Sequence, residues 1–260
     1  MSSSDGKFRK VRADQLVVEH GFAPSREQAR ALILAGEVSI NERRVEKAGQ
    51  MFSSDSRLAI RERPRFVGRG GEKLEGALTA FAVDTNGVMA LDVGASTGGF
   101  TDCLLQRGAT KVYAVDVGRG QMAERLRVDP RVVSQERTNA RHPLGLHEQV
   151  DIAVVDVSFI SLLLVLPETV SHVKPGGVVL ALVKPQFEAG RDRVGHKGVV
   201  RDPAVQADVI AKVTRWVIGR SDLRLLGVRR SILEGDKGNR EFFVLVGVGF
   251  QDPLRDSAFA

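Results

Sequence analysis

The sequence lacks several features that would place it in a specialised class of proteins. It holds one cysteine, Cys103, so an intrachain disulfide is impossible and a cytoplasmic location is expected. It has no stretch of about 18 uncharged apolar residues, which excludes a transmembrane helix. Residues 1–10 are polar and contain no apolar segment of the kind found in signal peptides, so no secretion signal is expected either.

The composition is otherwise that of an ordinary globular protein. Hydrophobic residues make up 43% of the chain and charged residues 27%, which excludes a disordered chain. Since a typical domain has roughly 150 residues, the 260 residues predict one large domain and one small domain.

The formal net charge of +6 is distributed unevenly along the chain. Residues 1–66 hold 13 lysines and arginines against 9 aspartates and glutamates, whereas the remaining residues hold 25 against 23. A quarter of the chain therefore carries most of the positive excess. This asymmetry favours contact with a polyanion, nucleic acid before a membrane surface. A slightly basic, solvated surface is the alternative.

Residues 8–60 are predicted to form the small domain, with mixed helices and strands. Ser25 precedes a helical pattern as an N-cap, with Gln28 at the capping-box position, and Gly36 ends that helix. The other elements expected are a helix over 11–20, strands at 38–40, 45 and 58–60, and a turn over 41–44.

Residues 61–67 combine charge with a proline and are expected to form an interdomain linker. Residues 68–250 alternate apolar strands with helical patterns. The strands expected are 88–93, 111–115, 132–134, 151–155, 177–183, 225–228 and 241–248, and the helices are 73–82, 99–106, 161–171 and 203–218. Short, nearly continuous apolar strands indicate a mostly parallel sheet covered on both faces. The predicted fold class is therefore α/β, a doubly wound, Rossmann-like domain.

A glycine-rich loop follows strand 88–93 and opens a helix, which is where an α/β sheet binds a nucleotide-like ligand. Its candidate binding residues are Gly94, Ser96, Thr97, Gly98, Gly99 and Phe100. Glycines let the backbone approach a ligand closely, and helix N–H groups face it. Ser96 breaks the dinucleotide fingerprint, which argues against NAD. The loop also spells the G-x-S-x-G of a hydrolase nucleophile elbow, but no histidine–acid pair stands out to complete a triad.

Two aspartates end successive strands beside this loop. Asp92 is placed to orient the cationic amino group of a methionine moiety, and Asp116 is placed to accept both hydroxyls of a ribose. One βαβ crossover separates them, which is the spacing that ribose recognition requires. We therefore predict S-adenosylmethionine as the cofactor. A helix N-cap is the alternative for Asp116.

Four charged residues are predicted to converge beside the methyl group of that cofactor. Asp156 ends strand 151–155, Lys184 ends the next strand, Lys73 begins a helix and Glu241 begins the last strand. A lysine that ends an apolar strand is costly unless it has a partner, which Asp156 supplies. Such a set suits methyl transfer to a ribose hydroxyl, a poor nucleophile that a lysine can orient or deprotonate. Two structural ion pairs are the alternative.

At these residues the sequence resembles the TlyA family, also called hemolysin A, over nearly the whole chain. Blocks 92–108 and 112–121 resemble the cofactor motifs of the family, and blocks 156–162 and 183–202 resemble its catalytic motifs. Members are S-adenosylmethionine-dependent ribosomal RNA 2′-O-methyltransferases. They have an FtsJ-like catalytic domain and an RNA-binding domain of the ribosomal protein S4 type. The resemblance implies both domains here, with cytidine 2′-O-methylation of ribosomal RNA as the activity.

The resemblance also implies roles for individual residues. The catalytic Lys-Asp-Lys-Glu set of the family maps onto Lys73, Asp156, Lys184 and Glu241. The residues expected to bind the cofactor are Asp92, Gly94, Ser96, Thr97, Gly98, Gly99, Phe100, Asp116, Val117, Asn139 and Asp156. The residues expected to bind RNA are Arg12, Arg26, Arg30, Arg43 and Arg44, each with a solvated surface charge as its alternative. No metal ion is expected.

Two positions depart from the family pattern. Phe66 stands where the linker of the family often carries tryptophan, and Ile232 stands where the family carries proline after serine.

Two other functions compete with methylation of ribosomal RNA. One is a non-catalytic RNA-binding factor for ribosome assembly, against which the intact Lys-Asp-Lys-Glu set argues. The other is a membrane-active hemolysin, which would need an amphipathic or spanning segment that the sequence does not contain. Ribosomal RNA or a ribosomal subunit is therefore the expected partner, and a membrane is not.

Overall fold

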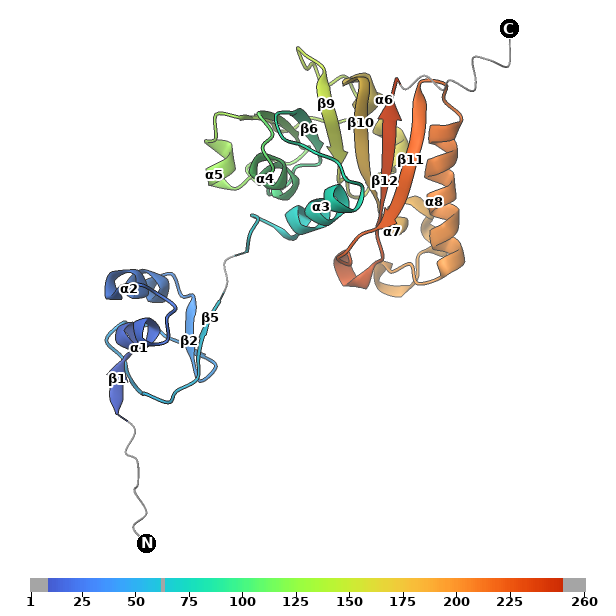
Figure 1. The fold of residues 1–260 in the computed structure, drawn as a ribbon. Coiled ribbons are helices and arrows are strands. Elements are labelled where there is room, and N and C mark those ends of the chain that lie inside the picture. The colour runs from blue at the N-terminus through green and yellow to red at the C-terminus, as the bar shows by residue number, and fades with distance from the viewer. Residues whose placement is uncertain (1–8, 62–63, 250–260) are drawn as a thin grey trace. The chain divides into compact units, whose positions relative to one another are not determined.

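The computed structural model describes residues 9–61 and 64–249, which belong to two compact units, residues 1–64 and 65–260 (Figure 1). Residue 8 of the expected small domain, residues 62 and 63 of the expected linker and residue 250 of the expected large domain lie outside the described residues. Phe66 of the expected linker is only 3% exposed and packs into the core of the second unit.

The first unit is a small α+β domain. Its elements are β1 (Lys10–Arg12), α1 (Ala13–Glu19), α2 (Arg26–Leu34), β2 (Val38–Ile40), β3 (Arg43–Arg44), β4 (Met51–Ser53) and β5 (Leu58–Ile60). Strands β3, β2 and β5 form one antiparallel sheet, and β1 pairs with β4 in another. Leu16 and Ile33 from the two helices meet Val38 and Ile40 of β2 in the core.

Local chemistry explains most of these boundaries. Ser25 caps α2 as predicted, because its hydroxyl accepts a hydrogen bond from the Gln28 N–H at 3.3 Å. The predicted turn over 41–44 is shorter than expected. Asn41 and Glu42 both have positive φ and form a two-residue hairpin turn, so Arg43 and Arg44 pair with β2 as strand β3.

The second unit is built on one seven-stranded sheet. Its strands are β6 (Met89–Val93), β7 (Lys111–Val115), β8 (Val132–Gln135), β9 (Val150–Val155), β10 (Val173–Val183), β11 (Leu223–Arg230) and β12 (Phe242–Val248). They lie in the order β11-β12-β10-β9-β6-β7-β8. Strands β10, β9, β6, β7 and β8 are parallel, and β12 is antiparallel to both of its neighbours. The predicted α/β class with a mostly parallel sheet is confirmed.

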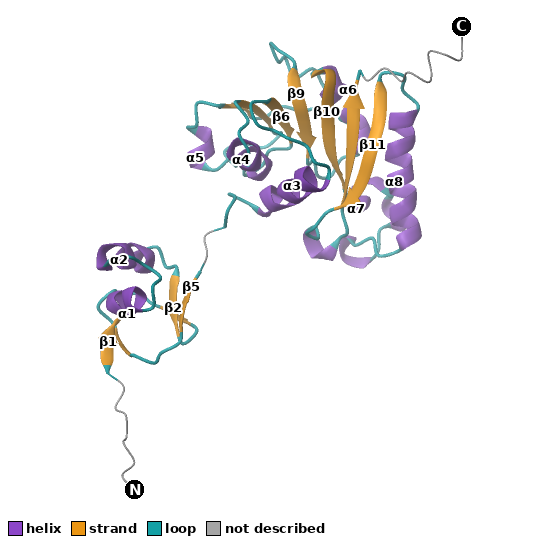
Figure 2. Ribbon diagram, viewed as in Figure 1, coloured by secondary structure: helices purple, strands orange, loops and turns teal. Residues whose placement is uncertain are grey.

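Helices cover both faces of this sheet (Figure 2). The helices are α3 (Arg69–Ala80), α4 (Gly99–Gln106), α5 (Glu124–Arg127), α6 (Leu166–Ser171), α7 (Pro185–Glu188) and α8 (Pro203–Ile218). Short 3₁₀ turns are η1 (Leu162–Leu164), η2 (Arg191–Arg193), η3 (His196–Gly198) and η4 (Asp236–Gly238). Alternate residues of each strand face opposite layers. Leu91 belongs to the buried cluster that includes residues of α6 and α8, whereas Ala90 belongs to the cluster that includes residues of α3 and α4.

Several expected elements have other bounds in the structure: Val11 and Arg12 of the helix expected over 11–20 belong to β1, and β10 and β11 are longer than the strands expected at 177–183 and 225–228. Helix α3 begins at Arg69, so Lys73 lies in its second turn and does not begin the helix. The expected helix 161–171 is divided into η1 and α6, with Pro167 in the first turn of α6. Strand β12 begins at Phe242, so Glu241 lies just before it.

Replacing Phe243 with alanine is expected to lower the free energy of unfolding by about 3–5 kcal/mol, because a cavity remains where a large buried ring was. The Phe243 ring is fully buried, and its centroid lies 6.2 Å from that of Phe100. Urea unfolding measures the change. The matched control is Leu226→Ala on β11, where the side chain is 41% exposed and the expected change is within about 0.5 kcal/mol. Equal effects of the two substitutions would contradict this account of the core.

Candidate active site

The candidate site lies where the strand order of the sheet reverses. Strand β6 has β7 on one side and β9 on the other, so the loops that follow β6 and β9 diverge from this point. Ligands of open α/β sheets bind at such a switch point, outside the carboxyl ends of the strands. Two cavities adjoin each other here. Asp156, Ser158 and Phe159 line both of them.

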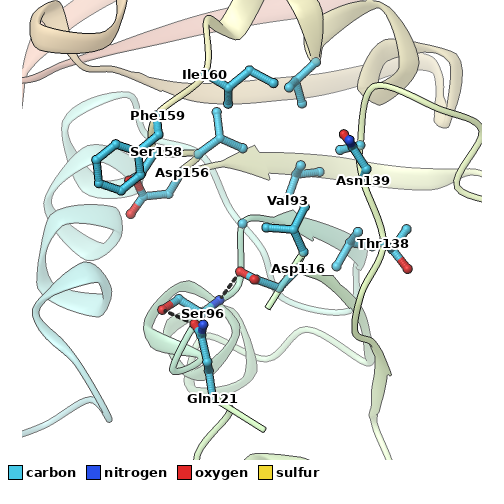
Figure 3. A pocket seen from close by; sticks show the side chains of 16 residues that line it. Val93, Ser96, Asp116, Gln121, Thr138, Asn139, Asp156, Ser158, Phe159 and Ile160 are labelled. Atoms are coloured by element: carbon cyan, nitrogen blue, oxygen red, sulfur yellow. Dashed lines mark hydrogen bonds between the residues drawn. The ribbon is translucent and has the colours of Figure 1, made fainter. Parts of the chain in front are cut away.

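The first cavity, of about 350 Å³, lies over the ends of β6, β7 and β9 (Figure 3). Six predicted cofactor residues line it: Gly94, Ser96, Asp116, Val117, Asn139 and Asp156. Five others do not: Asp92, Thr97, Gly98, Gly99 and Phe100. The sequence reasoning missed Gln121, which lines the cavity and accepts a hydrogen bond from the Ser96 hydroxyl at 3.2 Å (Figure 3).

Asp116 joins the loops that follow β6 and β7. Its Oδ2 accepts a hydrogen bond from the Ser96 N–H at 2.8 Å (Figure 3). Its Oδ1 accepts one from the Gly118 N–H at 2.6 Å. The next helix, α5, begins only at Glu124, so Asp116 is not a helix N-cap. Each carboxylate oxygen keeps a second lone pair that can accept a hydrogen bond from a ligand.

Gly94 brings the loops after β6 and β9 together. Its φ is +89°, and a Cβ at this position would lie 2.5 Å from the carbonyl oxygen of Asp156. Only glycine allows both this conformation and this approach. The position of Asp156 between the two cavities therefore depends on the absence of a side chain at Gly94.

Asp92 lies beneath α4 and not in the cavity. It is fully buried, its Oδ2 accepts a hydrogen bond from the Thr101 hydroxyl at 2.6 Å, and its Oδ1 has no partner among the described residues. Burial raises the pKa of Asp92 to about 7, and the charge of Asp156 adds to the rise while the Thr101 hydrogen bond opposes it. The predicted direct contact with a methionine amino group does not follow from this position.

Gly98, Gly99 and Phe100 do not line the cavity but pack beside it. Gly98 has φ +94° and caps the N-terminus of α4, and a Cβ at Gly99 would lie 3.0 Å from the backbone nitrogen of Gly71. The Phe100 side chain packs against Phe243 in the core.

The second cavity collects all four predicted catalytic residues. Lys73 Nζ donates a hydrogen bond to Glu241 Oε2 at 2.6 Å, and their side chains are 11% and 2% exposed. Lys184 Nζ lies 2.6 Å from Asp156 Oδ1 in a second ion pair. Two lysines and two carboxylates thus line one space next to the first cavity.

Ser158 and Phe159 also lie in this region. Both belong to block 156–162, which resembles a catalytic motif of the family, but the sequence did not predict a role for either residue. Ser158 accepts a hydrogen bond from Lys184 Nζ at 2.8 Å and so gives that lysine a second anchor. Phe159 is 91% exposed with φ +63°, and its ring centroid lies 5.0 Å from that of Phe187. An exposed aromatic ring therefore lies at the boundary between the two cavities (Figure 3).

Glu188 fixes the segments that carry Asp156 and Lys184 relative to each other. Its side chain is buried, and its two oxygens accept hydrogen bonds from the Ser161 hydroxyl at 2.7 Å and the Leu162 N–H at 2.5 Å. Lys212 of α8 adds an ion pair at 3.1 Å. Glu188 follows Lys184 closely in the sequence, but its partners lie on other segments, so no local pattern indicated its role.

The five predicted RNA-binding arginines of the first unit fall into two groups. Three of them surround Asp14, which is fully buried: Arg12 at 3.0 Å, Arg26 at 3.1 Å and Arg30 at 3.2 Å. Hydrogen bonds, above all from Arg12, hold the pKa of Asp14 well below its usual range. The second group, Arg43 and Arg44, lines a hollow together with Ile40, Asn41, Gln50 and Phe52.

Family models match both units: an FtsJ-like methyltransferase matches residues 66–248, and an S4 domain matches residues 11–58. YqxC, a candidate rRNA methyltransferase of Bacillus subtilis, is 47% identical over 240 residues, which cover 91% of this chain and 85% of that protein. The 16S/23S rRNA (cytidine-2′-O)-methyltransferase TlyA of Mycobacterium tuberculosis is 46% identical over 241 residues, covering 91% and 89%. This chain belongs to the TlyA family of FtsJ-like methyltransferases.

A solved structure agrees with this assignment. A candidate hemolysin from Streptococcus thermophilus is 40% identical, has a TM-score of 0.70 and covers 94% of this chain and 90% of its own. Membership of the TlyA family confirms the resemblance found in the sequence, and the chain is a methyltransferase. Within the described part of the chain, no helix combines the length and the apolar character needed to cross a membrane.

Replacing Asp92 with asparagine is expected to flatten the pH dependence of stability. The pKa of Asp92 rises from 3.8 in the unfolded chain to about 7 in the folded protein, which therefore keeps a proton that the unfolded chain loses. The contribution of Asp92 to the stability of the parent is fully present below about pH 4 and falls as the pH rises toward 7, with a limiting slope of about 1.4 kcal/mol per pH unit. Urea unfolding at a series of pH values measures this.

Thr101→Val supplies the matching control. It removes the hydrogen bond that opposes the effect of burial, so the fall in stability should extend to higher pH. If Asp92→Asn kept the pH dependence of the parent, another group would be responsible for it.

Proposed function

We propose that the chain transfers a methyl group from S-adenosylmethionine to a ribose 2′-hydroxyl of ribosomal RNA, with cytidine as the target nucleotide. One observation carries this proposal. The ion pairs Lys73–Glu241 and Lys184–Asp156 line a single cavity, and that cavity adjoins the one lined by Asp116. The similarity to the cytidine-2′-O-methyltransferase TlyA supports the choice of substrate.

The residues of the first cavity fit S-adenosylmethionine. Asp116 would accept hydrogen bonds from the ribose hydroxyls with its free lone pairs, and Asn139 would lie beside the adenine. Gly94 and Ser96 line the side from which the methionine part would be held. When bound, the cofactor supplies an electrophilic methyl group on a sulfonium centre. Asp156 lines both cavities, so cofactor and ribose would meet at this residue.

Lys184 would act on the attacking oxygen. A ribose hydroxyl is too weakly acidic to attack unaided. Lys184 Nζ forms an ion pair with Asp156 and donates one hydrogen bond to Ser158, so another of its hydrogens can be directed at the ribose O2′. There the ammonium group would orient the hydroxyl and stabilise the negative charge that develops on O2′, while the Asp156 carboxylate beside it would accept the hydroxyl proton as the oxygen takes up the methyl group. Holding the oxygen in line with the methyl group supplies much of the remaining rate.

Lys73 and Glu241 would form the opposite wall of the ribose site. Their ion pair is almost fully buried, and such a pair needs further hydrogen bonds to be stable. A ribose hydroxyl can supply one. Because the two lysines are balanced by two carboxylates, the cavity accepts a neutral sugar without a net charge.

The first unit would hold the RNA. Three guanidinium groups around one buried carboxylate carry a net charge of +2, and their side chains are 40–54% exposed. Arginines bind phosphate oxygens well, and such contacts supply affinity and position more than sequence choice. Asp14 is thus proposed as a positioning residue that aligns Arg12, Arg26 and Arg30 as one phosphate-binding surface.

Lys184→Ala is expected to lower kcat for methyl transfer to ribosomal RNA by about 100-fold or more, because positioned acid–base groups contribute at least that much. Its affinity for S-adenosylmethionine should stay near that of the parent. Transfer of a labelled methyl group to ribosomal subunits measures the first quantity, and isothermal titration calorimetry measures the second.

Two further variants serve as controls for this test. Lys174→Ala removes an exposed lysine at the other end of β10 and should keep full activity. Asp116→Ala should lose cofactor affinity, which Lys184→Ala does not. Full activity of Lys184→Ala would overturn the role proposed for Lys184. Absence of methyl transfer by the parent chain to any ribosomal RNA would overturn the proposed function.

Asp14→Asn is expected to weaken RNA binding although it removes a negative charge. If only the charge mattered, losing a carboxylate would strengthen the attraction to RNA. If Asp14 aligns the three arginines, affinity falls and log K depends less steeply on log[salt], because fewer phosphates are contacted. A salt series of RNA-binding measurements decides between the two directions.

Glu19→Gln is the matched control for this variant. Glu19 is an exposed acid on the same helix and lies outside the cluster around Asp14. Its neutralisation should leave RNA affinity unchanged or slightly raised. Tighter binding by Asp14→Asn, with a thermal melt like that of the parent, would show that Asp14 does not position the arginines.

A further inference from the structure

Two four-residue turns with the sequence pattern Gly-x-Lys-Gly lie beside the catalytic cavity. They are Gly195-His196-Lys197-Gly198 and Gly235-Asp236-Lys237-Gly238. In each turn the last glycine N–H donates to the carbonyl of the first glycine, at 3.1 and 3.2 Å. In each turn the first glycine N–H also donates to the carbonyl of the residue after the turn, at 3.1 and 2.8 Å. The two segments therefore form the same structure, although about 40 residues separate them.

Each turn holds its lysine in a left-handed backbone conformation. Lys197 has φ +67° and ψ +13°, and Lys237 has φ +58° and ψ +19°. This conformation costs roughly 1–2 kcal/mol for a residue other than glycine, and asparagine tolerates it better than lysine. Strained residues of this kind cluster at functional sites. Local stability would favour asparagine or glycine at both positions, so the lysines call for another explanation.

One buried side chain connects the two turns. Asn239 is 2% exposed, and its Nδ2 donates to the Gly198 carbonyl at 2.9 Å and to the Asp236 carbonyl at 3.0 Å. Its Oδ1 accepts from the Val200 N–H at 3.0 Å. Both N–H groups of the amide and its oxygen are hydrogen-bonded to backbone atoms of these segments, so Asn239 fixes the spacing of the turns.

The second turn contacts a catalytic residue, and both turns line the catalytic cavity, the first through Gly198 and the second through Asp236 and Lys237. A Cβ at Gly235 would overlap the carboxylate of Glu241, and the turns line the same cavity as Lys73 and Lys184.

The charges around the two lysines leave them available to a ligand. Both side chains are exposed, and within residues 9–61 and 64–249 no carboxylate lies at ion-pair distance from either. The nearby acids have other partners. Asp208 pairs with Arg193 at 2.6 Å, and Glu234 pairs with Arg230 at 3.4 Å. Asp236 lies in the second turn, and it lowers the local positive charge without pairing with Lys237.

We propose that the two turns form a clamp for backbone phosphates of the substrate RNA, next to the nucleotide whose ribose enters the catalytic cavity. The inference rests on the proposed function, because the ligand is the RNA strand that is methylated. Lysine binds a phosphate as a mobile point charge, which suits a backbone of variable sequence. Asn239 holds the backbones of the two turns at a set spacing, and Gly235 allows the second turn to lie against Glu241.

The test uses substitutions that separate charge from backbone conformation. Lys197→Asn and Lys237→Asn remove the charge but keep a residue that adopts the left-handed conformation readily. We expect the double variant to melt at the temperature of the parent or above it. Its kcat/KM for ribosomal RNA should fall by about tenfold, with log K against log[salt] shallower by about 1 for each lysine. Its affinity for S-adenosylmethionine should not change.

Two controls complete the design. The double variant Lys197→Arg, Lys237→Arg keeps both charges and should keep most of the activity. Arg224→Ala removes one exposed charge near the other end of β11 and should leave kcat/KM and the salt slope unchanged.

The outcomes are distinguishable. Unchanged RNA affinity and salt slope in the asparagine double variant, with the parent active, would overturn the clamp alone. A parent that methylates no ribosomal RNA would overturn the proposed function itself. An equal loss in the arginine variant would also overturn the clamp, because it would show that the lysines act through their backbone and not their charge.

Discussion

Gly94 and the carbonyl group of Asp156 lie so close together that any side chain at position 94 would strike main-chain atoms. This contact joins the loops that follow β6 and β9 at the point where the strand order reverses. As a result, Asp156 lines the cavities on both sides, and its carboxylate holds Lys184. Glu188 supports the same arrangement, because it joins the segment that follows Asp156 to the segment that follows Lys184. The geometry of both cavities thus depends on one glycine with positive φ and one buried carboxylate.

Much of the second unit could be predicted because its signals are local. Short apolar runs indicated the strands, and the carboxyl ends of parallel strands share one edge of a sheet, so Asp116, Asp156 and Lys184 were expected near one another. The start of α3 was missed for a physical reason. Gly70 and Gly71 look like loop residues in the sequence, but they lie in the first turn of the helix, where Phe66 and Phe100 pack closely against them.

Features that depend on distant partners could not be predicted. Asp92 ends a strand as Asp116 does, but it shares the strand face of Ala90, which α4 covers, so it is buried against Thr101. The role of Asn239 could not be predicted for the same reason. A single asparagine after a glycine carries no local signal, and its importance comes from carbonyl groups of two turns that meet only in the folded chain. The Asp14 cluster likewise joins residues from α1 and α2 with Arg12 of β1.

The distribution of charge over the surface matters more for RNA contact than the net charge of a unit. Composition assigns polyanion binding to residues 1–66, because the remaining residues hold 25 lysines and arginines against 23 acids. In the folded second unit, however, many acids are paired with arginines or lysines away from the cavity, such as Asp222 with Arg220 and Asp151 with Lys174. Lys197 and Lys237 have no such partner among the described residues. A nearly neutral unit can therefore present positive charge where its catalytic cavity opens, and the basic first unit need not supply all of the attraction for RNA.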